Sequence, residues 1–196
     1  VPPSFSRQLL MPKLELFRNA YPDIELTLQV AIPLLDIAGE DADLEIRFGT
    51  GQYADRECLP LVPDQVTPAC SPNYLNEHGP FHGFETEAEF AQARLMRSPL
   101  EPWSPWFRHC GLQRGEPTSG DRFNDLGLVY DAAAGGFGVA LVRLRLGQGW
   151  LDSGRLVRLS PQAVPSPHCH YLCWQPGTLE RWECAAFVDW IKQALA

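Results

Sequence analysis

The sequence predicts an α/β fold in which helices pack on largely parallel sheets. Segments with the alternating pattern of strands take turns along the chain with segments that have the spacing of amphipathic helices. Hydrophobic residues make up 45% of the 196 residues, which suits a packed core rather than disorder. Two sheets of roughly four or five strands each accommodate the predicted strands better than one long sheet. We therefore expect two lobes.

The chain begins with a loop and a helix. Residues 12–20 follow a helical period, and we place the start of the main helix at Pro12 because proline is tolerated only in a first turn. Residues 24–32 alternate and are rich in β-formers, which predicts a strand, and the polar residues among them place it at a sheet edge. The elements expected next are a short helix at 34–40, strands at 43–48, 56–62 and 65–70, a helix start at 71–75, a helix at 86–92, a strand at 94–98 and a helix at 103–110.

Residues 123–142, FNDLGLVYDAAAGGFGVALV, predict a helix, a glycine turn and a buried strand. Asn124 or Asp125 can cap the helix, because these side chains accept hydrogen bonds from free backbone N–H groups. Gly135 and Gly136 end the helix, since glycine tolerates the left-handed conformation. The elements expected after this block are a helix at 144–153, strands at 156–159 and 170–174, and a last helix at 179–195.

We expect the chain to pass between the two sheets near residues 70–72 and again near 174–176. This assigns residues 1–71 to a first lobe, 72–174 to a second, and 175–196 to the first lobe again. Ligands of open α/β sheets lie at the carboxyl ends of strands, so two facing lobes imply a cleft between them. Val1 is not methionine and leads directly into a patterned segment, so we interpret the chain as a fragment of a longer protein.

Composition and motifs exclude several functions. A net charge of −8 argues against a chain that grips nucleic-acid phosphates by itself, and no apolar run has membrane-spanning length. The six cysteines are scattered, as in reduced intracellular proteins. Residues 168–173 contain His, Cys, His and Cys, but a strand would direct the histidines and cysteines to opposite faces, so we expect no metal, and no redox role either. Residues 48–51 lack the lysine of a phosphate-binding loop, and we expect no cofactor.

The sequence contains no catalytic motif that we recognise. It has neither the nucleophile elbow GxSxG nor the zinc motif HExxH, and no Cys–His pair in a familiar context. The five histidines lie mostly in polar segments and are interpreted as surface groups. We therefore predict that the chain is not an enzyme.

Several blocks resemble the effector-binding domain of LysR-type transcriptional regulators. They are PSFSRQLLMPKLELFRNAYPDIEL, DADLEIRFG, LVPDQVTPACSPNYL, FNDLGLVYDAAAGGFGVALVRLRLGQGWLDSGRLVRL, YLCWQP and AFVDWI, in this order and over nearly the whole chain. The resemblance is greatest to the subgroup that includes the glycine-cleavage activator and the β-lactamase regulator. Glu45 departs from the family pattern, which usually has a hydrophobic residue there.

This resemblance implies two Rossmann-like lobes of the type II periplasmic-binding-protein kind, joined by two crossovers, with an effector cleft between the lobes. It also implies an N-terminal winged helix-turn-helix, absent from these residues, as the only part that would contact DNA. The expected protein is cytoplasmic and forms a homodimer or homotetramer. Its effector is a small molecule such as an amino acid, a carboxylate or a peptide fragment.

The same resemblance suggests the residues that contact the effector. Polar groups at a helix start can hold an anion, and aromatic or apolar groups can wall the cleft. Each polar candidate has a structural alternative, because Ser4, Ser6, Asn124 and Asp125 can be helix caps, and Trp103 can equally belong to the core. Whether Arg97, Arg122 or Arg143 points inward stays open. The candidates are Ser4, Phe5, Ser6, Ile32, Pro33, Phe48, Ser98, Trp103, Phe123, Asn124 and Asp125.

Family dimers suggest an antiparallel pairing of subunits. In it, the helix at residues 12–20 and the edge strand at 24–30 pack against the helix at 126–134 of another copy, as an isologous interface requires. Two other readings are kept. The first is a free-standing periplasmic solute-binding protein of the same fold, and the second, weaker one is an enzyme on the same scaffold.

Overall fold

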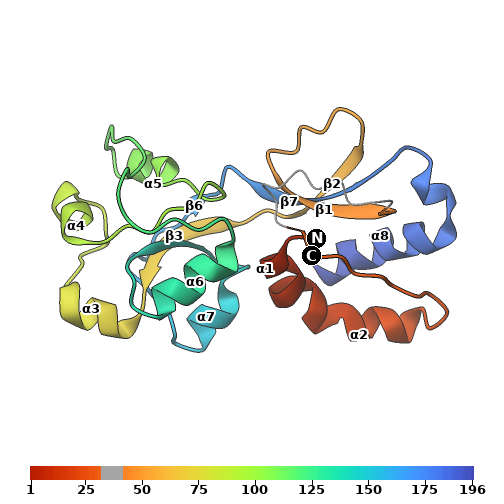
Figure 1. Cartoon of the computed structure of the whole chain (residues 1–196), viewed down its shortest axis with the longest axis horizontal. Helices are drawn as coiled ribbons and strands as arrows, with labels where there is room; N and C mark the ends of the chain where they lie inside the picture. The colour runs from red at the N-terminus through yellow and green to blue at the C-terminus, as the bar shows by residue number, and fades with distance from the viewer. Residues whose placement is uncertain (32–41) are drawn as a thin grey trace. The chain divides into compact units, whose positions relative to one another are not determined.

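A computed structural model describes residues 1–31 and 42–196 of the chain (Figure 1). The chain is organised as two units, one formed by Val1–Pro63 with His168–Ala196 and the other by Asp64–Pro167. We call them unit 1 and unit 2. Each contains a sheet and the helices that pack on it.

Unit 1 has a three-stranded sheet with β7 at its centre. Strand β7 (Cys169–Trp174) runs antiparallel to β1 (Leu44–Gly49) on one side and to β2 (Glu57–Val62) on the other. The helices of this unit are α1 (Pro3–Phe5), the π-helical turn η1 (Ser6–Leu10), α2 (Met11–Ala20), the 3-10 turn η2 (Thr178–Glu180) and α8 (Trp182–Ala194).

The core of unit 1 forms where α2 and α8 lie side by side (Figure 1). Phe17 of α2 is fully buried, and its ring lies 5.2 Å from that of Phe187 and 5.0 Å from that of Trp190, both on α8. Ile46 and Leu172 of the sheet belong to the same cluster. Two helices whose apolar faces meet over a sheet explain why both ends of the chain fold into one unit.

Strand β7 has two different faces, because successive side chains of a strand alternate. Leu172 and His170 are buried on the face that carries the core of unit 1. Cys169, Tyr171 and Cys173 occupy the alternate positions. The alternation expected from the sequence is therefore present, with histidine and cysteine on opposite faces.

Unit 2 has a four-stranded sheet around β3 (Gln65–Cys70). Strands β4 (Ala140–Arg143) and β5 (Val157–Arg158) pair with β3 on its two sides, and β6 (Val164–Pro165) pairs with its first residues. The helices of this unit are α3 (Pro72–His78), α4 (Glu87–Gln92), α5 (Ser104–His109), α6 (Leu126–Ala134) and α7 (Gln148–Asp152).

An aromatic cluster forms much of the core of unit 2. Phe84, Trp103, Trp106 and Phe107 are each at most 1% exposed. The indole N–H of Trp106 donates to the carbonyl of Phe84 at 2.9 Å, so its burial leaves that polar group satisfied. This cluster packs α5 against the loop that precedes α4.

Residues 123–142 fold as the sequence predicts. Asp125 caps α6, accepting a hydrogen bond from the N–H of Leu128 at 3.0 Å, and Gly135 ends the helix. Tyr130 on the buried face of α6 accepts a hydrogen bond from the N–H of Arg143 at 3.0 Å. The helix is thereby fixed to the strand that follows it in sequence.

Three sequence predictions differ from the structure. Residues 24–31 form no strand ladder with the described residues. The amino group of Val1 donates to the carbonyl of Gln29, and the carbonyl of Val1 accepts from the N–H of Ala31. Residues 94–98 form isolated bridges instead of a strand, since consecutive residues bond to different segments. The ladders of the described residues are antiparallel rather than parallel, because β3 and β7 run opposite to their neighbours. The helix expected at 34–40 lies outside the described residues.

The limits of the two units also differ from the predicted ones at residues 71 and 174. Strand β3 belongs to unit 2, because β4, β5 and β6 are its hydrogen-bonded neighbours. Strand β7 belongs to unit 1, because β1 and β2 flank it. Both changes of unit therefore occur before these strands begin.

Within residues 1–31 and 42–196, none of the helices combines the length and the hydropathy that a membrane span requires.

Candidate functional site

In unit 1, the candidate residues lie at the start of the first helix. Ser4, Phe5 and Ser6 are all buried, with Phe5 fully so. The hydroxyl of Ser6 donates to the carbonyl of Pro3 at 2.8 Å, which is a local bond within the first turn. This bond is not an N-cap, because a cap accepts from a backbone N–H, and neither α1 nor η1 has a side-chain cap.

Phe5 and Phe48 are far apart in sequence but meet at His170. The ring of His170 lies 4.7 Å from that of Phe5 and 4.6 Å from that of Phe48. His168 adds an edge contact to Phe48 at 5.6 Å. The structure thus brings two of the predicted residues together around a buried histidine, and Phe5 belongs to the hydrophobic core of unit 1.

Ile32 and Pro33, the remaining candidates of unit 1, lie outside the described residues.

In unit 2, the candidates Ser98, Phe123 and Asn124 lie on neighbouring segments. Arg97 forms a parallel bridge with Arg122, through a hydrogen bond from its N–H to Asp121 and another from the N–H of Phe123 to its carbonyl. The bridge sets Ser98 alongside Phe123, one residue before Asn124. Ser98 is half-buried and Asn124 exposed. The two polar side chains that were predicted from the sequence, Ser98 and Asn124, therefore lie on neighbouring segments of unit 2.

Trp103 and Asp125 have structural roles. Trp103 is 1% exposed and its indole N–H donates to the carbonyl of Met96 at 2.8 Å, which places it in the core as the alternative reading had it. Asp125 is buried as the cap of α6. Asn124, beside it, carries no capping bond in the structure and is the more accessible of the two amide and carboxylate groups.

A buried ion cluster holds the turn that carries Ser98. Glu101 bridges back to Ser98, and its carboxylate lies 3.0 Å from the guanidinium of Arg143. Asp64 lies 3.6 Å from the same guanidinium, and the hydroxyl of Ser166 bonds to Glu101 at 2.9 Å. The Arg143 side chain is fully buried. Charge-assisted hydrogen bonds of this kind fix geometry, so the cluster positions the turn at residues 98–101.

Each carboxylate of the cluster keeps further donors. Asp64 accepts from the backbone N–H groups of Gln65, Arg145 and Leu146. Burial raises the pKa of Tyr130, whose hydroxyl is beside Arg143, so the phenol stays neutral.

The three arginines that the sequence left open are now placed. The guanidinium of Arg97 donates to the carbonyls of Pro117 and Gly120, and Arg122 is exposed. Arg143 belongs to the ion cluster. Of these three side chains, Arg122 is the one that solvent reaches most freely.

Two residues of this region escaped the sequence reasoning. His170 was interpreted as a surface group, and the structure shows it 2% exposed between two phenylalanines. His170 lies two residues before Leu172, and residues two apart in a strand share a face. This spacing was the signal that His170 points into the core. Glu101 carried no such signal, because its partners Arg143 and Ser166 are distant in sequence.

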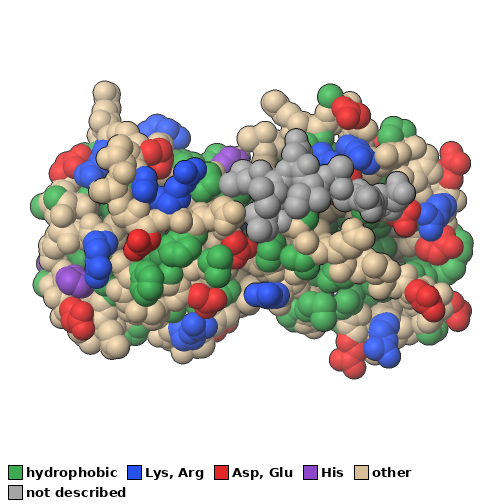
Figure 2. All heavy atoms as spheres, viewed as in Figure 1, with side chains coloured by type: hydrophobic (Ala, Val, Ile, Leu, Met, Phe, Trp, Pro, Cys, Tyr) green, Lys and Arg blue, Asp and Glu red, His purple; other side chains and the backbone are tan. Residues whose placement is uncertain are grey.

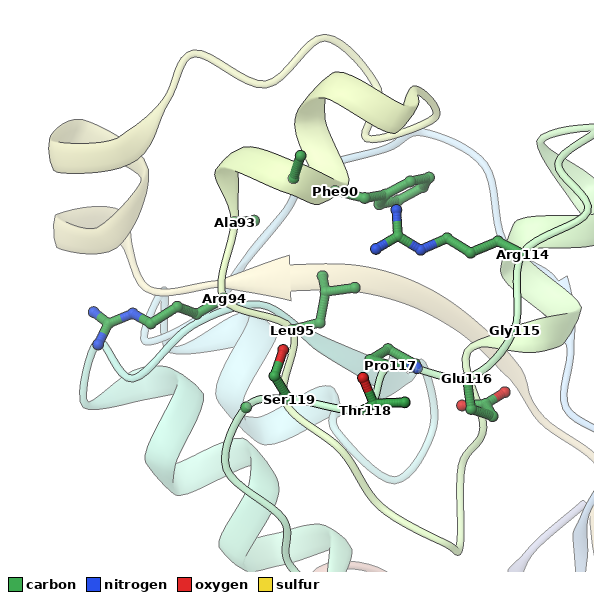
Figure 3. Close-up of a pocket in the computed structure, with 12 residues that line it drawn as sticks. Phe90, Ala93, Arg94, Leu95, Arg114, Gly115, Glu116, Pro117, Thr118 and Ser119 are labelled. Carbon is green, nitrogen blue, oxygen red and sulfur yellow. The ribbon is translucent and has the colours of Figure 1, made fainter.

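A separate hollow of about 330 Å³ lies in unit 2 (Figure 3). It is lined by residues 90–91, 93–95 and 114–120, and none of the predicted candidates lines it. Figure 3 shows Arg114 lying across Phe90, 5.7 Å from the ring centroid, and Arg94 directed away from the hollow. Arg114 is also paired with Glu87 at 2.6 Å. The main cation of this hollow is therefore already neutralised.

Metal ligation finds no support in the described part of the chain, where no three His, Cys, Asp or Glu side chains gather as a metal would need. The chemistry that the two sets of candidates offer is hydrogen bonding from hydroxyl, amide and backbone groups beside aromatic rings. Such groups bind and orient a small polar molecule.

Comparison with known proteins gives a consistent family relationship. The family model described as "LysR substrate binding domain" matches residues 1–196. The chain is 30% identical over 190 residues to the glycine cleavage system transcriptional activator of Escherichia coli (strain K12), covering 96% of this chain and 61% of that protein. The chain thus spans about three fifths of the length of this curated relative.

Two solved structures are similar over almost the whole chain. The effector domain of the transcriptional regulator AmpR of Pseudomonas aeruginosa is 28% identical, with a TM-score of 0.85, and the match covers 98% of this chain and 91% of that one. The AmpR effector binding domain from Citrobacter freundii is 25% identical with a TM-score of 0.85, covering 99% and 94%. The two-lobed α/β fold predicted from the sequence is thereby confirmed.

Proposed function

Because the chain belongs to the family of LysR substrate binding domains, we propose that it is the effector-sensing part of a bacterial transcriptional regulator. The observation that carries the proposal is the family match over residues 1–196, joined by curated relatives that are transcriptional activators. In this proposal DNA is contacted through a winged helix-turn-helix outside these residues, and the protein acts in the cytoplasm. The acidic net charge of −8 agrees with a chain that does not itself hold DNA.

We propose that the effector is an amino acid, a carboxylate or a peptide fragment. Ser98 and Asn124 supply a hydroxyl and an amide on neighbouring segments of unit 2. The half-buried ring of Phe123, beside Ser98, supplies an apolar surface. A ligand with one polar, hydrogen-bonding end and a short apolar body matches this set of groups.

The proposed regulation is a shift between two states of the regulator. An effector changes the balance only by its differential affinity for the two states, and the size of that difference limits the response. The ion cluster of Glu101 and Arg143 contributes by holding the turn at residues 98–101 in one geometry. Residues that contact the effector are thus held in advance, which lowers the entropy cost of binding.

Thermal-shift screening with single amino acids, small carboxylates and short peptides tests the effector site. A ligand at 100 times its dissociation constant stabilises the folded state by about 2.7 kcal/mol, which raises the melting temperature measurably. The Ser98→Ala and Asn124→Ala variants should each lose the shift and keep the melting temperature of the free protein.

The matched control is Ser119→Ala, which removes a hydroxyl from the separate hollow of unit 2. It should leave the ligand-induced shift unchanged. A shift that survives in both site variants and disappears in the control would transfer the effector to the hollow at residues 114–120 and refute the proposed site.

We also propose that the chain self-associates through the surfaces that the sequence suggested. Large hydrophobic side chains are exposed there: Leu16 of α2 is 62% exposed, Val30 56%, and Leu128 of α6 53%. Figure 2 shows hydrophobic side chains gathered over α2 and over α6 on the face in view. Exposed apolar groups on these segments favour an isologous contact between two copies.

Sedimentation measures this association. Leu128→Glu should weaken it at least about tenfold, because a carboxylate cannot be desolvated cheaply in an apolar contact. Trp182→Glu is the control: Trp182 is 58% exposed on α8, outside the proposed surface. Equal losses in both variants, or a wild-type chain that stays monomeric at high micromolar concentration, would overturn the proposed pairing.

The periplasmic alternative is disfavoured, because the curated relatives of the chain are transcriptional regulators. The proposal also treats the chain as a binding domain without catalytic activity.

A further inference from the structure

Two cysteines of unit 1 face each other across the sheet. Cys58 on β2 and Cys173 on β7 are direct partners in the antiparallel register, and their sulfur atoms lie 2.6 Å apart. The Cα atoms of directly opposed residues in an antiparallel pair are about 4.5–5.5 Å apart, within the range of about 4.4–6.8 Å that a disulfide requires. Joining these sulfurs therefore needs no movement of the backbone.

The pair lies on the polar face of the sheet. Cys173 is opposite Glu45 on its other side, and Glu45 is ion-paired with Arg47 at 2.7 Å and with Arg56 at 3.2 Å. The core of unit 1, with Leu172 and Ile46, occupies the opposite face. A reaction between the two sulfurs would therefore leave the hydrophobic core undisturbed.

Accessibility differs between the two thiols. Cys58 is half-buried, whereas Cys173 is fully buried. Burial first, and then the hydrogen bond from Cys58, raise the pKa of Cys173, so its thiol stays protonated and unreactive by itself. Burial also raises the pKa of Cys70 to about 12 and that of Cys110 to about 11. Cys58 is thus the thiol that an oxidant in solution reaches, and Cys173 is the resolving thiol beside it.

We propose that Cys58 and Cys173 form a reversible intramolecular disulfide when the protein meets hydrogen peroxide. The Cys58 thiol releases its proton, and the thiolate attacks one oxygen of hydrogen peroxide and breaks the O–O bond. This step gives a sulfenic acid and a hydroxide ion, which takes up the released proton to become water. The Cys173 sulfur then attacks the Cys58 sulfur, the S–O bond breaks, and a second water leaves with the Cys173 proton. Two thiols lose two electrons and two protons, and the peroxide is reduced to two waters. A dithiol reductant reverses the link by exchange.

The position of the pair gives the link a regulatory consequence. Strand β2 ends at Val62, next to Pro63, the residue after which the chain enters unit 2. Strand β7 begins at Cys169, one residue after the chain has returned to unit 1 at His168. A disulfide would join covalently the two strands from which both connections to unit 2 emerge, and this holds whatever the effector is.

Thiol counting and peptide mapping test the proposal on the whole chain. The reduced protein is treated with one equivalent of hydrogen peroxide, unfolded, and its free thiols are titrated. Two of the six thiols should disappear together, and the intact mass should fall by two hydrogen atoms. After alkylation of the remaining thiols, a peptide map made without reductant should contain the peptide of Cys58 linked to that of Cys173. Dithiothreitol should restore all six.

Variants and a control separate the pair from the other thiols. Cys58→Ser and Cys173→Ser should each abolish the link, while Cys110→Ser, which changes another half-buried thiol, should leave it intact. The wild-type map decides the matter even if a variant fails to fold. A link between any other two cysteines, or sulfinic acid at Cys58 with Cys173 still a free thiol, would overturn the proposal.

Discussion

Replacing Arg143 by methionine should destabilise unit 2 strongly. The Arg143 side chain is fully buried, and the carboxylates of Glu101 and Asp64 beside it are 2% and 1% exposed. Breaking a buried ion pair by removing one partner costs about 3–5 kcal/mol, because a charge is left without compensation. Three backbone N–H groups still bond to Asp64, and the Ser166 hydroxyl still bonds to Glu101, so we expect the lower end, about 3 kcal/mol.

Urea unfolding followed by tryptophan fluorescence measures this loss. With a slope of about 2 kcal/mol per molar urea, a loss of about 3 kcal/mol lowers the midpoint by about 1.5 M. Arg155→Met is the matched control, because Arg155 forms a bond of 3.1 Å to Asp131 but is 57% exposed. An exposed pair contributes at most about 1 kcal/mol, so the control should move the midpoint by less than about 0.5 M.

The double variant Arg143→Met with Glu101→Gln sharpens the result. If the two side chains act as one pair, the double variant should lose clearly less stability than the sum of the single losses. Equal midpoints for Arg143→Met and Arg155→Met, or strict additivity in the double variant, would refute the view that the cluster is a buried, coupled unit.

The remaining predictions concern pH, association and redox state. Burial alone would raise the pKa of Glu89, but hydrogen bonds from the Thr86 hydroxyl and from backbone N–H groups lower it below its usual value. A lowered folded-state pKa means that the stabilisation is present above the unfolded pKa of about 4.3 and is lost as the pH falls. Glu89→Gln should therefore lose less stability than the wild type between about pH 5 and pH 3 in urea titrations, and an identical pH dependence would contradict the assignment. Leu128→Glu should weaken self-association at least about tenfold in sedimentation experiments, and Trp182→Glu should not. Hydrogen peroxide should convert two thiols of the wild type into a disulfide, and peptide mapping should find no such disulfide in Cys58→Ser.

Local chemistry made much of the fold predictable. The cap at Asp125 and the end at Gly135 define α6 because both act within one helical turn. The segment 169–174 alternates, and its two faces in the structure are those that the alternation predicts. Such features depend on neighbours in sequence, and they were read from the sequence alone.

The predictions that failed depend on partners distant in sequence. Residues 94–98 have strand-like composition, yet Leu95 bridges to Val139 and Arg97 to Arg122, so no continuous ladder forms. The direction of each sheet also depends on which strands become neighbours, and periodicity does not encode this. For these reasons the sheets were expected to be parallel, and the ladders are antiparallel.

The candidate site was predictable to a similar degree. Ser98 and Asn124 were selected as polar residues at element ends, and the bridge between residues 97 and 122 sets their segments side by side. The aromatic contact of Phe5 and Phe48 with His170 joins three segments, so no local pattern could reveal it. The effector role of these residues stays a prediction.

NMR titration of the labelled chain tests the central claim most directly. Once screening has found a stabilising ligand, amide resonances are followed as the ligand is added. The account predicts that residues 98 and 123–124 of unit 2 shift together, with one common dissociation constant. Shifts centred on the hollow at residues 114–120, with none at residues 98 and 123–124, would contradict the proposed effector site.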